Sequence, residues 1–412
     1  MERSCLKKKF FLFLMFFCVC TAMLACDFFG EESDKVVSSR AYSGHENDAD
    51  ANNFVKVYPS KVATRLDDCQ TCHGGGTLTY ASDGTSTKSI DNACNWCHYI
   101  EFPDTSTYTE ASHPQSYYDT LNSYGRAYMD GGRSAAAIKN IASLDSDGDG
   151  YSNGDEIADN RYPGNSASMP GQPLSATIEL TWAQITAMTR HNQFMLMNTT
   201  KQQYDDYVNY TGVTIASLLE TAGVDMTGAT GVTVFAPDGF KVQFDLADIT
   251  DTFPEATFYR ESGKNYGNED PLYDCTTYPA NINSLVHGDT IGSTINTAGL
   301  RMILAYQREG VNLSASYYDG STGKLEGEGP YRLVIPQRTV SGPDRGSRSS
   351  QKTTDDGYNF VSSYDHNAGS CNRGACIIRV DPMPAGYEEY DTTNGWSLIT
   401  DKKVVIYGQG VN

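Results

Sequence analysis

Two short motifs of cysteine and histidine carry the most specific chemistry in this sequence. Each reads Cys-x-x-Cys-His, at residues 69–73 and 94–98, and only 20 residues separate them. The spacing is typical of covalent haem attachment, because two thiols add to the two vinyl groups of one haem while the adjacent histidine reaches the iron. We therefore expect two haem c groups. The attachment residues are Cys69, Cys72, Cys94 and Cys97, and the proximal iron ligands are His73 and His98.

Other uses of paired cysteines remain as alternatives. A four-cysteine zinc ribbon also contains two Cys-x-x-Cys pairs, but it gives no reason for a histidine after both pairs. Disulfide pairing of the same cysteines is the second alternative, and it does not explain the histidines either.

A sixth ligand for each haem iron has to come from elsewhere in the chain. Of the seven histidines, His45 and His113 flank the two motifs, and we expect them to supply the distal imidazoles. Met129 and Met169 are the competing thioether ligands. Two histidine ligands give a low reduction potential, whereas a histidine and a methionine give a higher one.

An acidic stretch, residues 145–156, matches a twelve-residue EF-hand loop that binds Ca²⁺. Gly150 stands at the sharp turn of position six, and Ile157 follows as an apolar plug. Ile138, Ile141 and Leu144 predict an amphipathic entering helix. The alternative is an acidic turn without metal. The expected ligands, in order, are Asp145, Asp147, Asp149, the carbonyl of Tyr151, Asn153 and Glu156.

The N-terminus resembles a bacterial lipoprotein signal. Basic residues precede a 15-residue apolar run, Phe10–Leu24, which suits a signal peptide and is short for a membrane span. Ala25 precedes Cys26, which we expect to be acylated once residues 1–25 are removed. Cleavage near Ala25 without a lipid is the alternative. The chain is thus expected to be exported to the periplasm or cell surface and anchored to a bacterial membrane, with the outer membrane favoured.

The charge of the chain excludes one class of partner. The 412 residues carry a net charge of −20, and residues 1–25 carry +3, so the mature chain carries about −23. Nucleic acid is not an expected partner, because phosphates would be repelled. Redox partner proteins or extracellular electron acceptors are the expected partners.

The distribution of helix and strand signals along the sequence predicts a multidomain α+β protein. A small, mostly helical or irregular dihaem domain with a single EF-hand-like loop precedes a β-rich mixed α+β domain. Short β-type runs occur at 231–236, 241–245, 331–335 and 403–407, and 214–222 predicts a capped helix. The expected parts are a signal peptide at 1–25, a tether at 26–50, the dihaem domain at 51–165, a linker at 166–175 and the second domain at 176–412.

Several stretches of the second domain resemble the sulfite-oxidase-type molybdopterin-binding family. Tyr210–Val224 is similar to its segment with a Gly-Val pair, and 233–240 is similar to a strand that ends in an Asp-Gly turn. Residues 302–306 and 327–336 look like its "LAY" and "RLVvP" strands. The resemblance covers about residues 176–410 and implies a β-rich mixed fold.

The resemblance does not extend to the molybdenum ligand. In that family a cysteine upstream of the Gly-Val segment binds molybdenum, and this chain has no cysteine between Ala176 and Thr211. We therefore expect an accessory binding domain without molybdopterin; a haem-fed molybdenum-dependent oxidoreductase is the alternative. Cys275, Cys371 and Cys376 lie downstream. A loop closed by Cys371 and Cys376 is one possible disulfide, and Cys275 competes for either partner.

The first half resembles lipoprotein dihaem cytochromes of metal- and sulfur-respiring bacteria. The resemblance lies in the haem motif pair, the calcium loop within 144–157 and the segment Thr120–Gly125. It implies transfer of electrons in a respiratory chain rather than catalysis on a substrate, although it identifies no donor or acceptor.

Overall fold

The computed structural model describes fourteen stretches of the chain, all within one unit, Ser38–Asn412. They are residues 49–62, 64–67, 69–73, 77–81, 87–91, 118, 121–199, 205–237, 240–258, 276–277, 293–295, 299–319, 324–342 and 363–412.

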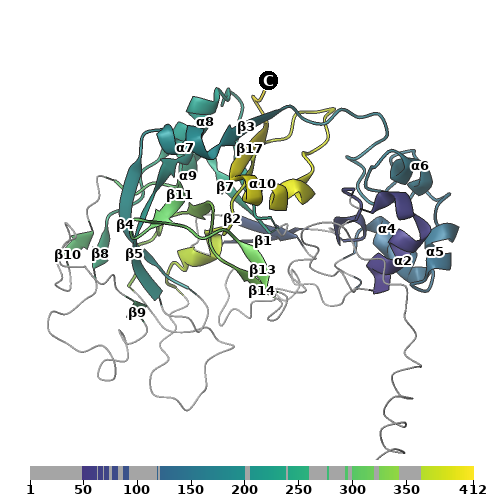
Figure 1. Cartoon of the computed structure of the whole chain (residues 1–412), viewed down its shortest axis with the longest axis horizontal. Coiled ribbons are helices and arrows are strands. Elements are labelled where there is room, and N and C mark those ends of the chain that lie inside the picture. The colour runs from purple at the N-terminus through teal and green to yellow at the C-terminus, as the bar shows by residue number, and fades with distance from the viewer. Residues whose placement is uncertain are drawn as a thin grey trace, which may run out of the picture. The chain divides into compact units, whose positions relative to one another are not determined.

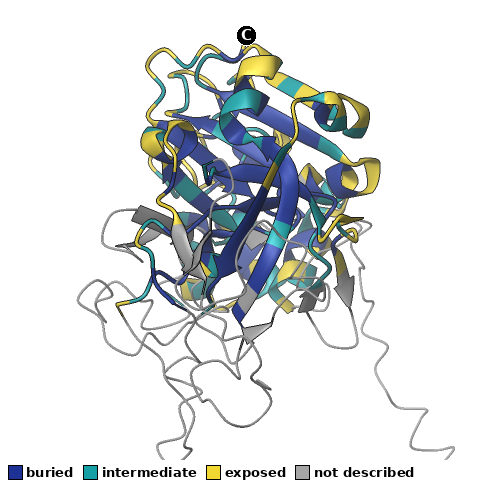
Figure 2. Ribbon diagram, turned by 90° about the vertical axis from the view of Figure 1, so that its left-hand side faces the viewer, coloured by how far each residue is buried: buried dark blue, intermediate teal, exposed yellow. Residues whose placement is uncertain are grey.

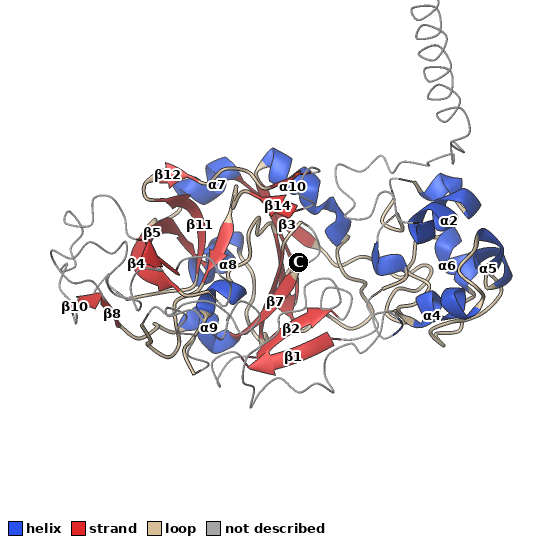
Figure 3. Ribbon diagram, turned by 90° about the horizontal axis from the view of Figure 1, so that it is seen from below, coloured by secondary structure: helices blue, strands red, loops and turns tan. Residues whose placement is uncertain are grey.

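The part before residue 165 is built mainly from short helices. Figures 1 and 3 show four of them grouped together: α2 (Ala49–Val57), α4 (Ser123–Asp130), α5 (Ala135–Asn140) and α6 (Asn153–Ala158). Two 3₁₀ turns, η1 (Pro59–Lys61) and η2 (Cys69–Thr71), connect them to the first cysteine motif. Two strands, β1 (Thr77–Ala81) and β2 (Thr87–Asp91), pair antiparallel between the two motifs. The helices bury a small core that includes Phe54, Tyr124, Tyr128, Ile138 and Ile157.

A five-stranded sheet forms one half of the C-terminal part. Its order is β3–β17–β16–β6–β7, and only the β16–β17 pair is parallel. The strands span Thr177–Thr181 (β3), Gly231–Phe235 (β6), Lys241–Asp245 (β7), Ile377–Asp381 (β16) and Lys403–Gly408 (β17).

A six-stranded sheet forms the other half. Its main path is β12–β11–β5–β4, while β15 pairs with β11 and β9 with β5. The strands span His191–Met197 (β4), Asp205–Thr214 (β5), Thr276–Thr277 (β9), Ile303–Arg308 (β11), Val311–Asn312 (β12) and Arg332–Val334 (β15). Two further antiparallel pairs join β8 (Ala256–Phe258) to β10 (Ser293–Ile295) and β13 (Tyr317–Asp319) to β14 (Lys324–Glu326).

The two large sheets share one hydrophobic core. Residues of β4, β5, β11 and β15 pack with residues of β6, β7, β16 and β17 in a single buried cluster. Figure 2 shows these strands buried in the interior, while exposed residues lie on the surrounding helices and turns. A smaller cluster lies between the five-stranded sheet and α10 (Gly395–Asp401). The remaining helical elements are α7 (Trp182–Ala187), α8 (Ile215–Ala222), α9 (Leu246–Thr250), η7 (Asn367–Ser370) and η8 (Thr392–Asn394).

Local sequence signals in this part are confirmed. The four predicted β runs form β6, β7, β15 and β17, and the predicted capped helix forms α8. The hydroxyl of Thr214 accepts a hydrogen bond from the Ser217 amide at 3.1 Å, and Gly223 ends the helix with a φ of 78°. The mixed α+β class is therefore confirmed.

Three of the stretches that resemble the molybdopterin family meet in one sheet. Leu304 of β11 pairs with Val213 of β5 on one side and with Leu333 of β15 on the other. A Cβ on Gly212 would collide with the carbonyl oxygen of Leu304, so close strand packing explains the glycine in the Gly-Val pair. The contacts explain these residues by strand packing and carry no information about cofactor binding.

The entering helix of the acidic loop is shorter than predicted. Helix α5 ends at Asn140, Ile141 is its C-cap, and Leu144 lies outside it and is 48% exposed. The Leu144 backbone amide donates to the Ile141 carbonyl at 3.0 Å, three residues back instead of four, so the α-helical pattern does not continue. Two carbonyls that follow the helix bond to the other end of the loop. The Asn153 backbone amide donates to the Leu144 carbonyl at 2.7 Å, and the Gly154 backbone amide donates to the Ala142 carbonyl at 2.8 Å. The prediction for Leu144 was therefore wrong, whereas Ile138 and Ile141 are buried.

Among the residues described above, no helix combines the length and the apolar character needed to cross a membrane.

Candidate metal centre and haem-attachment loop

The acidic loop lies between two short capped helices. The hydroxyl of Ser134 caps α5 by accepting from the Ala137 amide, and the hydroxyl of Ser152 caps α6 by accepting from the Asp155 amide. Gly148 and Gly150 adopt φ values of 82° and 102°. Side chains rarely tolerate this left-handed backbone, so the two glycines are what allow the loop to turn back on itself.

Three carboxylates converge at the centre of the loop. The ligand oxygens of Asp145, Asp147 and Asp149 all lie within 4.8 Å of one another. Asp145 uses both oxygens to accept loop amides, from Gly148 at 2.7 Å and from Gly150 at 3.0 Å. These bonds fix the curvature of the first half of the loop.

Four buried carboxylate oxygens of the loop have no hydrogen-bond partner within the described part of the chain. Asp147 and Asp149 each direct Oδ1 to a backbone amide, of Asp149 and Tyr151 respectively. Their Oδ2 atoms, and both oxygens of the fully buried Glu156, are buried without a partner. Buried polar atoms of this kind are costly, and a cation is one group that can satisfy all four at once.

The pKa values of the loop carboxyls reflect this crowding. Burial, with a further contribution from Asp147 and Asp149, raises the pKa of Glu156 to about 8. Burial and the neighbouring Asp149 carboxylate raise the pKa of Asp147 to about 6. Like charges in a desolvated site disfavour ionisation, so a cation bound among these carboxyls would favour their charged form. The donor set consists of oxygens alone, which suits a hard divalent cation.

Asn153, expected as the ligand at position nine, has a structural role in the described loop. Its side-chain nitrogen, Nδ2, donates to the Ile141 carbonyl at 2.7 Å and to the Ser146 hydroxyl at 2.9 Å. Its side-chain oxygen, Oδ1, accepts from the Ser146 backbone amide at 3.2 Å. The side chain is completely buried. It therefore closes the loop from within. Tyr151 is 40% exposed, so its carbonyl rather than its ring remains the candidate ligand at position seven.

The first Cys-x-x-Cys-His motif, the predicted attachment site of one haem, begins with a 3₁₀ turn, Cys69–Thr71, and one asparagine holds it in place. The side-chain nitrogen of Asn122 lies 3.1 Å from the Gln70 carbonyl, 3.2 Å from the Thr71 carbonyl and 3.1 Å from the His73 carbonyl. The backbone amide of Asn122 also donates to the Cys72 carbonyl at 3.0 Å. One residue thus binds the backbone of most of the motif.

The same asparagine begins helix α4. Its side-chain oxygen accepts from the Gly125 amide at 2.9 Å, which caps the helix. A Cβ on Gly125 would collide with the Cys72 carbonyl oxygen, so the helix can approach the motif only with glycine there. Cys72 and His73 are each half-buried. This partial exposure, together with a thiol and an imidazole in adjacent positions, fits covalent attachment of a haem.

Several of the predicted site residues lie wholly or partly outside the described part of the chain. Of the first motif, the side chain of Cys69 is not described. Six further predicted residues lie outside the described residues: Cys26, His45, Cys94, Cys97, His98 and His113. The competing ligands Met129 and Met169 are described, and each is half-buried.

The remaining described cysteines are separated by the sheet. Cys371 belongs to the core shared by both sheets, with its sulfur 4.0 Å from the Met197 sulfur, whereas Cys376 belongs to the cluster beside α10. A disulfide between these two is not formed. Cys275 lies outside the described residues.

The role of Asn122 leads to a prediction of stability. Replacing Asn122→Ala removes the two N–H donors that three carbonyls of the motif share, and it removes the cap of α4. We expect a loss of about 2 kcal/mol in the free energy of unfolding, measured with denaturant. The control is Asn140→Ala at the exposed end of α5, which should change little. Equal midpoints for the two variants would contradict the role given to Asn122.

Comparisons with known proteins give no family for this chain. No protein-family model matches it, and neither a curated protein nor a solved structure does. The acidic loop, the two Cys-x-x-Cys-His motifs and the contacts that hold them are the features of the chain that bear on its function.

Proposed function

We propose that this protein is an exported, lipid-anchored dihaem c-type cytochrome that transfers electrons in a respiratory chain. The observation that carries the proposal is the pair of Cys-x-x-Cys-His motifs at 69–73 and 94–98, so close in sequence that two haems would lie near one another. When bound, the haems supply one-electron redox chemistry at iron.

The protein's own residues would attach the haems and supply the ligands of their irons. Cys69 and Cys72 would hold one haem and Cys94 and Cys97 the other, while His73 and His98 would be the proximal ligands. His45 and His113 are the proposed distal ligands. If these histidines ligate the irons as proposed, no iron position would be left for a substrate, and this would favour an electron carrier over a catalyst.

The acidic loop is proposed to bind Ca²⁺ and to stabilise the haem region. The four unpartnered oxygens of Asp147, Asp149 and Glu156 support this part of the proposal. Asp145, the Tyr151 carbonyl and water complete a set of six to eight oxygens. A single loop in a calcium-rich exterior acts as a permanent clamp rather than a switch.

The C-terminal part is proposed to be an accessory binding domain. Its alternative role is that of a molybdenum-dependent oxidoreductase supplied with electrons by the haems. The lack of a cysteine between Ala176 and Thr211 favours the accessory role. Redox proteins or extracellular electron acceptors are the proposed partners, and the lipid on Cys26 would hold the protein at a bacterial membrane, with the outer membrane favoured.

Calcium should raise the thermal stability of the haem-loaded protein. At calcium 100 times above the dissociation constant, binding stabilises the folded state by about 2.7 kcal/mol. Most of this gain should disappear in Glu156→Gln, which removes one charged ligand. The matched control is Asp155→Asn, an exposed carboxylate in the same helix that bonds to the Ser152 hydroxyl. Melting curves that coincide in calcium and in chelator would show that the loop is only a turn.

Metal analysis separates the electron carrier from the enzyme. Protein from a host that matures c-type haem and receives molybdate should contain about two irons per chain and essentially no molybdenum. The double variant Cys69→Ser/Cys72→Ser should lose about one iron, whereas Cys376→Ala, outside the motifs, should lose none. Near-stoichiometric molybdenum would overturn the carrier assignment and favour the oxidoreductase.

A further inference from the structure

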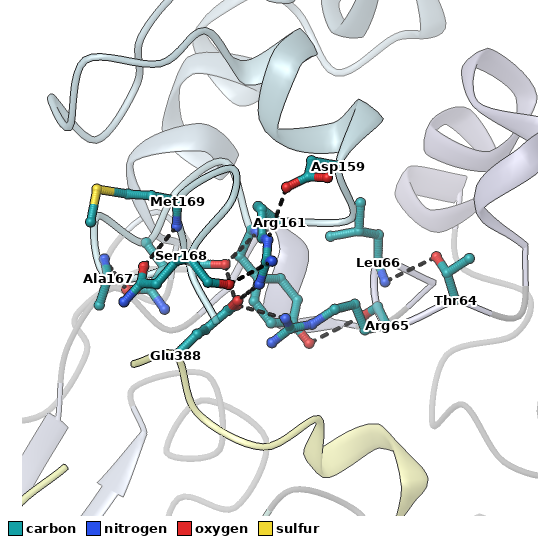
Figure 4. A network of polar contacts seen from close by, with 12 residues as sticks. Thr64, Arg65, Leu66, Asp159, Arg161, Ala167, Ser168, Met169 and Glu388 are labelled. Atoms are coloured by element: carbon teal, nitrogen blue, oxygen red, sulfur yellow. Dashed lines mark hydrogen bonds and ion pairs between the residues drawn. The ribbon is translucent and has the colours of Figure 1, made fainter. Parts of the chain in front are cut away.

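A buried carboxylate from the C-terminal part lies among side chains of the N-terminal part. Glu388 is 3% exposed, and Figure 4 shows its side chain between two arginines and a serine. Oε1 accepts from Arg65 Nη1 at 2.6 Å and also from the Ser168 hydroxyl. Oε2 accepts from Arg161 Nη1. We call Arg65, Arg161, Ser168 and Glu388 the Glu388 cluster.

The backbone of Glu388 is fixed as firmly as its side chain. Its amide donates to the Pro173 carbonyl at 2.9 Å, and its carbonyl accepts from the Ser175 amide at 2.9 Å. Leu174 and Glu388 consequently form a parallel bridge. The predicted linker, 166–175, is thus attached to residue 388 both near its start and at its end, because Ser168 belongs to the cluster and the Ser175 amide bonds to the Glu388 carbonyl.

One arm of the cluster leads to the acidic loop. The Arg161 amide donates to the carbonyl of Glu156 at 2.7 Å, directly after helix α6. The Arg161 side chain also bonds to Asp159 Oδ2 at 3.3 Å and to the Gln172 carbonyl at 2.8 Å. The Gly171 amide donates to the same Asp159 oxygen at 2.9 Å. The exit of α6 and the linker are therefore one hydrogen-bonded unit that begins at Glu156.

The other arm leads to the first haem motif. The Arg65 guanidinium lies 4.4 Å from the ring centre of Tyr162, whose hydroxyl donates to the Arg65 carbonyl at 3.2 Å. The next residue, Leu66, accepts a hydrogen bond from the Thr71 hydroxyl at 2.8 Å, inside the motif. Gln70, also in the motif, donates to the Thr392 hydroxyl at 3.1 Å. Segment 388–392 therefore touches the motif both directly and through Arg65.

The charges of the cluster make it sensitive to the loss of Glu388. The single negative charge of Glu388 is shared between the positive charges of Arg65 and Arg161. The Arg65 side chain is only 9% exposed. Removing one partner of a buried ion pair leaves the other charge uncompensated, which is strongly unfavourable. Without Glu388, Arg161 and Arg65 would have to move toward water and would carry the ends of α6 and of the haem motif with them.

We propose that the Glu388 cluster couples calcium binding to the packing of segment 388–392 on the first haem motif. This inference rests on the proposed calcium site. Calcium bound to the buried Glu156 would hold α6 in place and keep Arg161 positioned for Glu388, and Glu388 in turn holds the end of α6 next to the loop. Each event therefore favours the other, as thermodynamic linkage requires.

Calcium titration of the full-length, haem-loaded protein tests the coupling. Glu388→Gln should weaken calcium binding about 5- to 10-fold, although residue 388 touches no proposed ligand side chain. The matched control is Glu389→Gln, which removes the same charge one residue later. Glu389 bonds to Arg379 and Tyr407 within the C-terminal part, so its variant should bind calcium as tightly as the original protein.

Hydrogen exchange on the unmodified protein gives a second readout that does not depend on a variant folding. Removal of calcium should speed exchange in peptides covering 64–73, 173–175 and 388–392, and leave the paired amides of β6 and β16 unchanged. Equal calcium affinities for the two variants, or unchanged exchange in those peptides, would overturn the coupling while leaving the calcium site intact. A wild-type protein that binds no calcium would overturn both.

Discussion

The buried charge of Glu388 is the interaction on which the arrangement of the rest depends. It is the point where the exit helix of the acidic loop, the residues before the first haem motif and the linker to the second domain meet. Burying a carboxylate is costly, and two arginines and a serine compensate that cost only if all three segments stay in place. The cluster therefore makes the position of each segment a condition for the position of the others.

The two candidate sites follow a common principle, in which the backbone is fixed by groups that are not ligands. Asn153 closes the acidic loop from within, so that Glu156 and the Oδ2 atoms of Asp147 and Asp149 are left to face a cation. Asn122 holds the carbonyls of the first haem motif, so that Cys72 and His73 keep their side chains partly exposed. In both cases the side chain of an asparagine hydrogen-bonds to backbone carbonyls. The neighbouring carboxylates, thiol and imidazole are then available to bind a metal ion or a cofactor.

Sequence reasoning succeeded where the determining contacts are local. Helix α8, with its cap at Thr214 and its stop at Gly223, and the strands β6, β7, β15 and β17 follow from patterns a few residues long. The convergence of Asp145, Asp147 and Asp149 also follows from their spacing in the sequence, while calcium binding at this loop stays a prediction. Leu144 was misplaced because the chain turns after Ile141, and the Leu144 carbonyl accepts a hydrogen bond from the Asn153 backbone amide across the loop. Glu388 gave no signal, since its partner Arg65 is 323 residues away and neither residue belongs to a motif.

Electron transfer by six-coordinate haems is the central claim, and the spin state of the oxidised protein tests it most directly. Electron paramagnetic resonance of the full-length, haem-loaded protein should show only low-spin ferric iron, because the proposed proximal histidine and distal ligand would together supply each iron with two protein ligands. Cyanide should then bind slowly. A high-spin ferric signal from either haem, with rapid cyanide binding, would reveal an open iron site and contradict the assignment of this protein as an electron carrier.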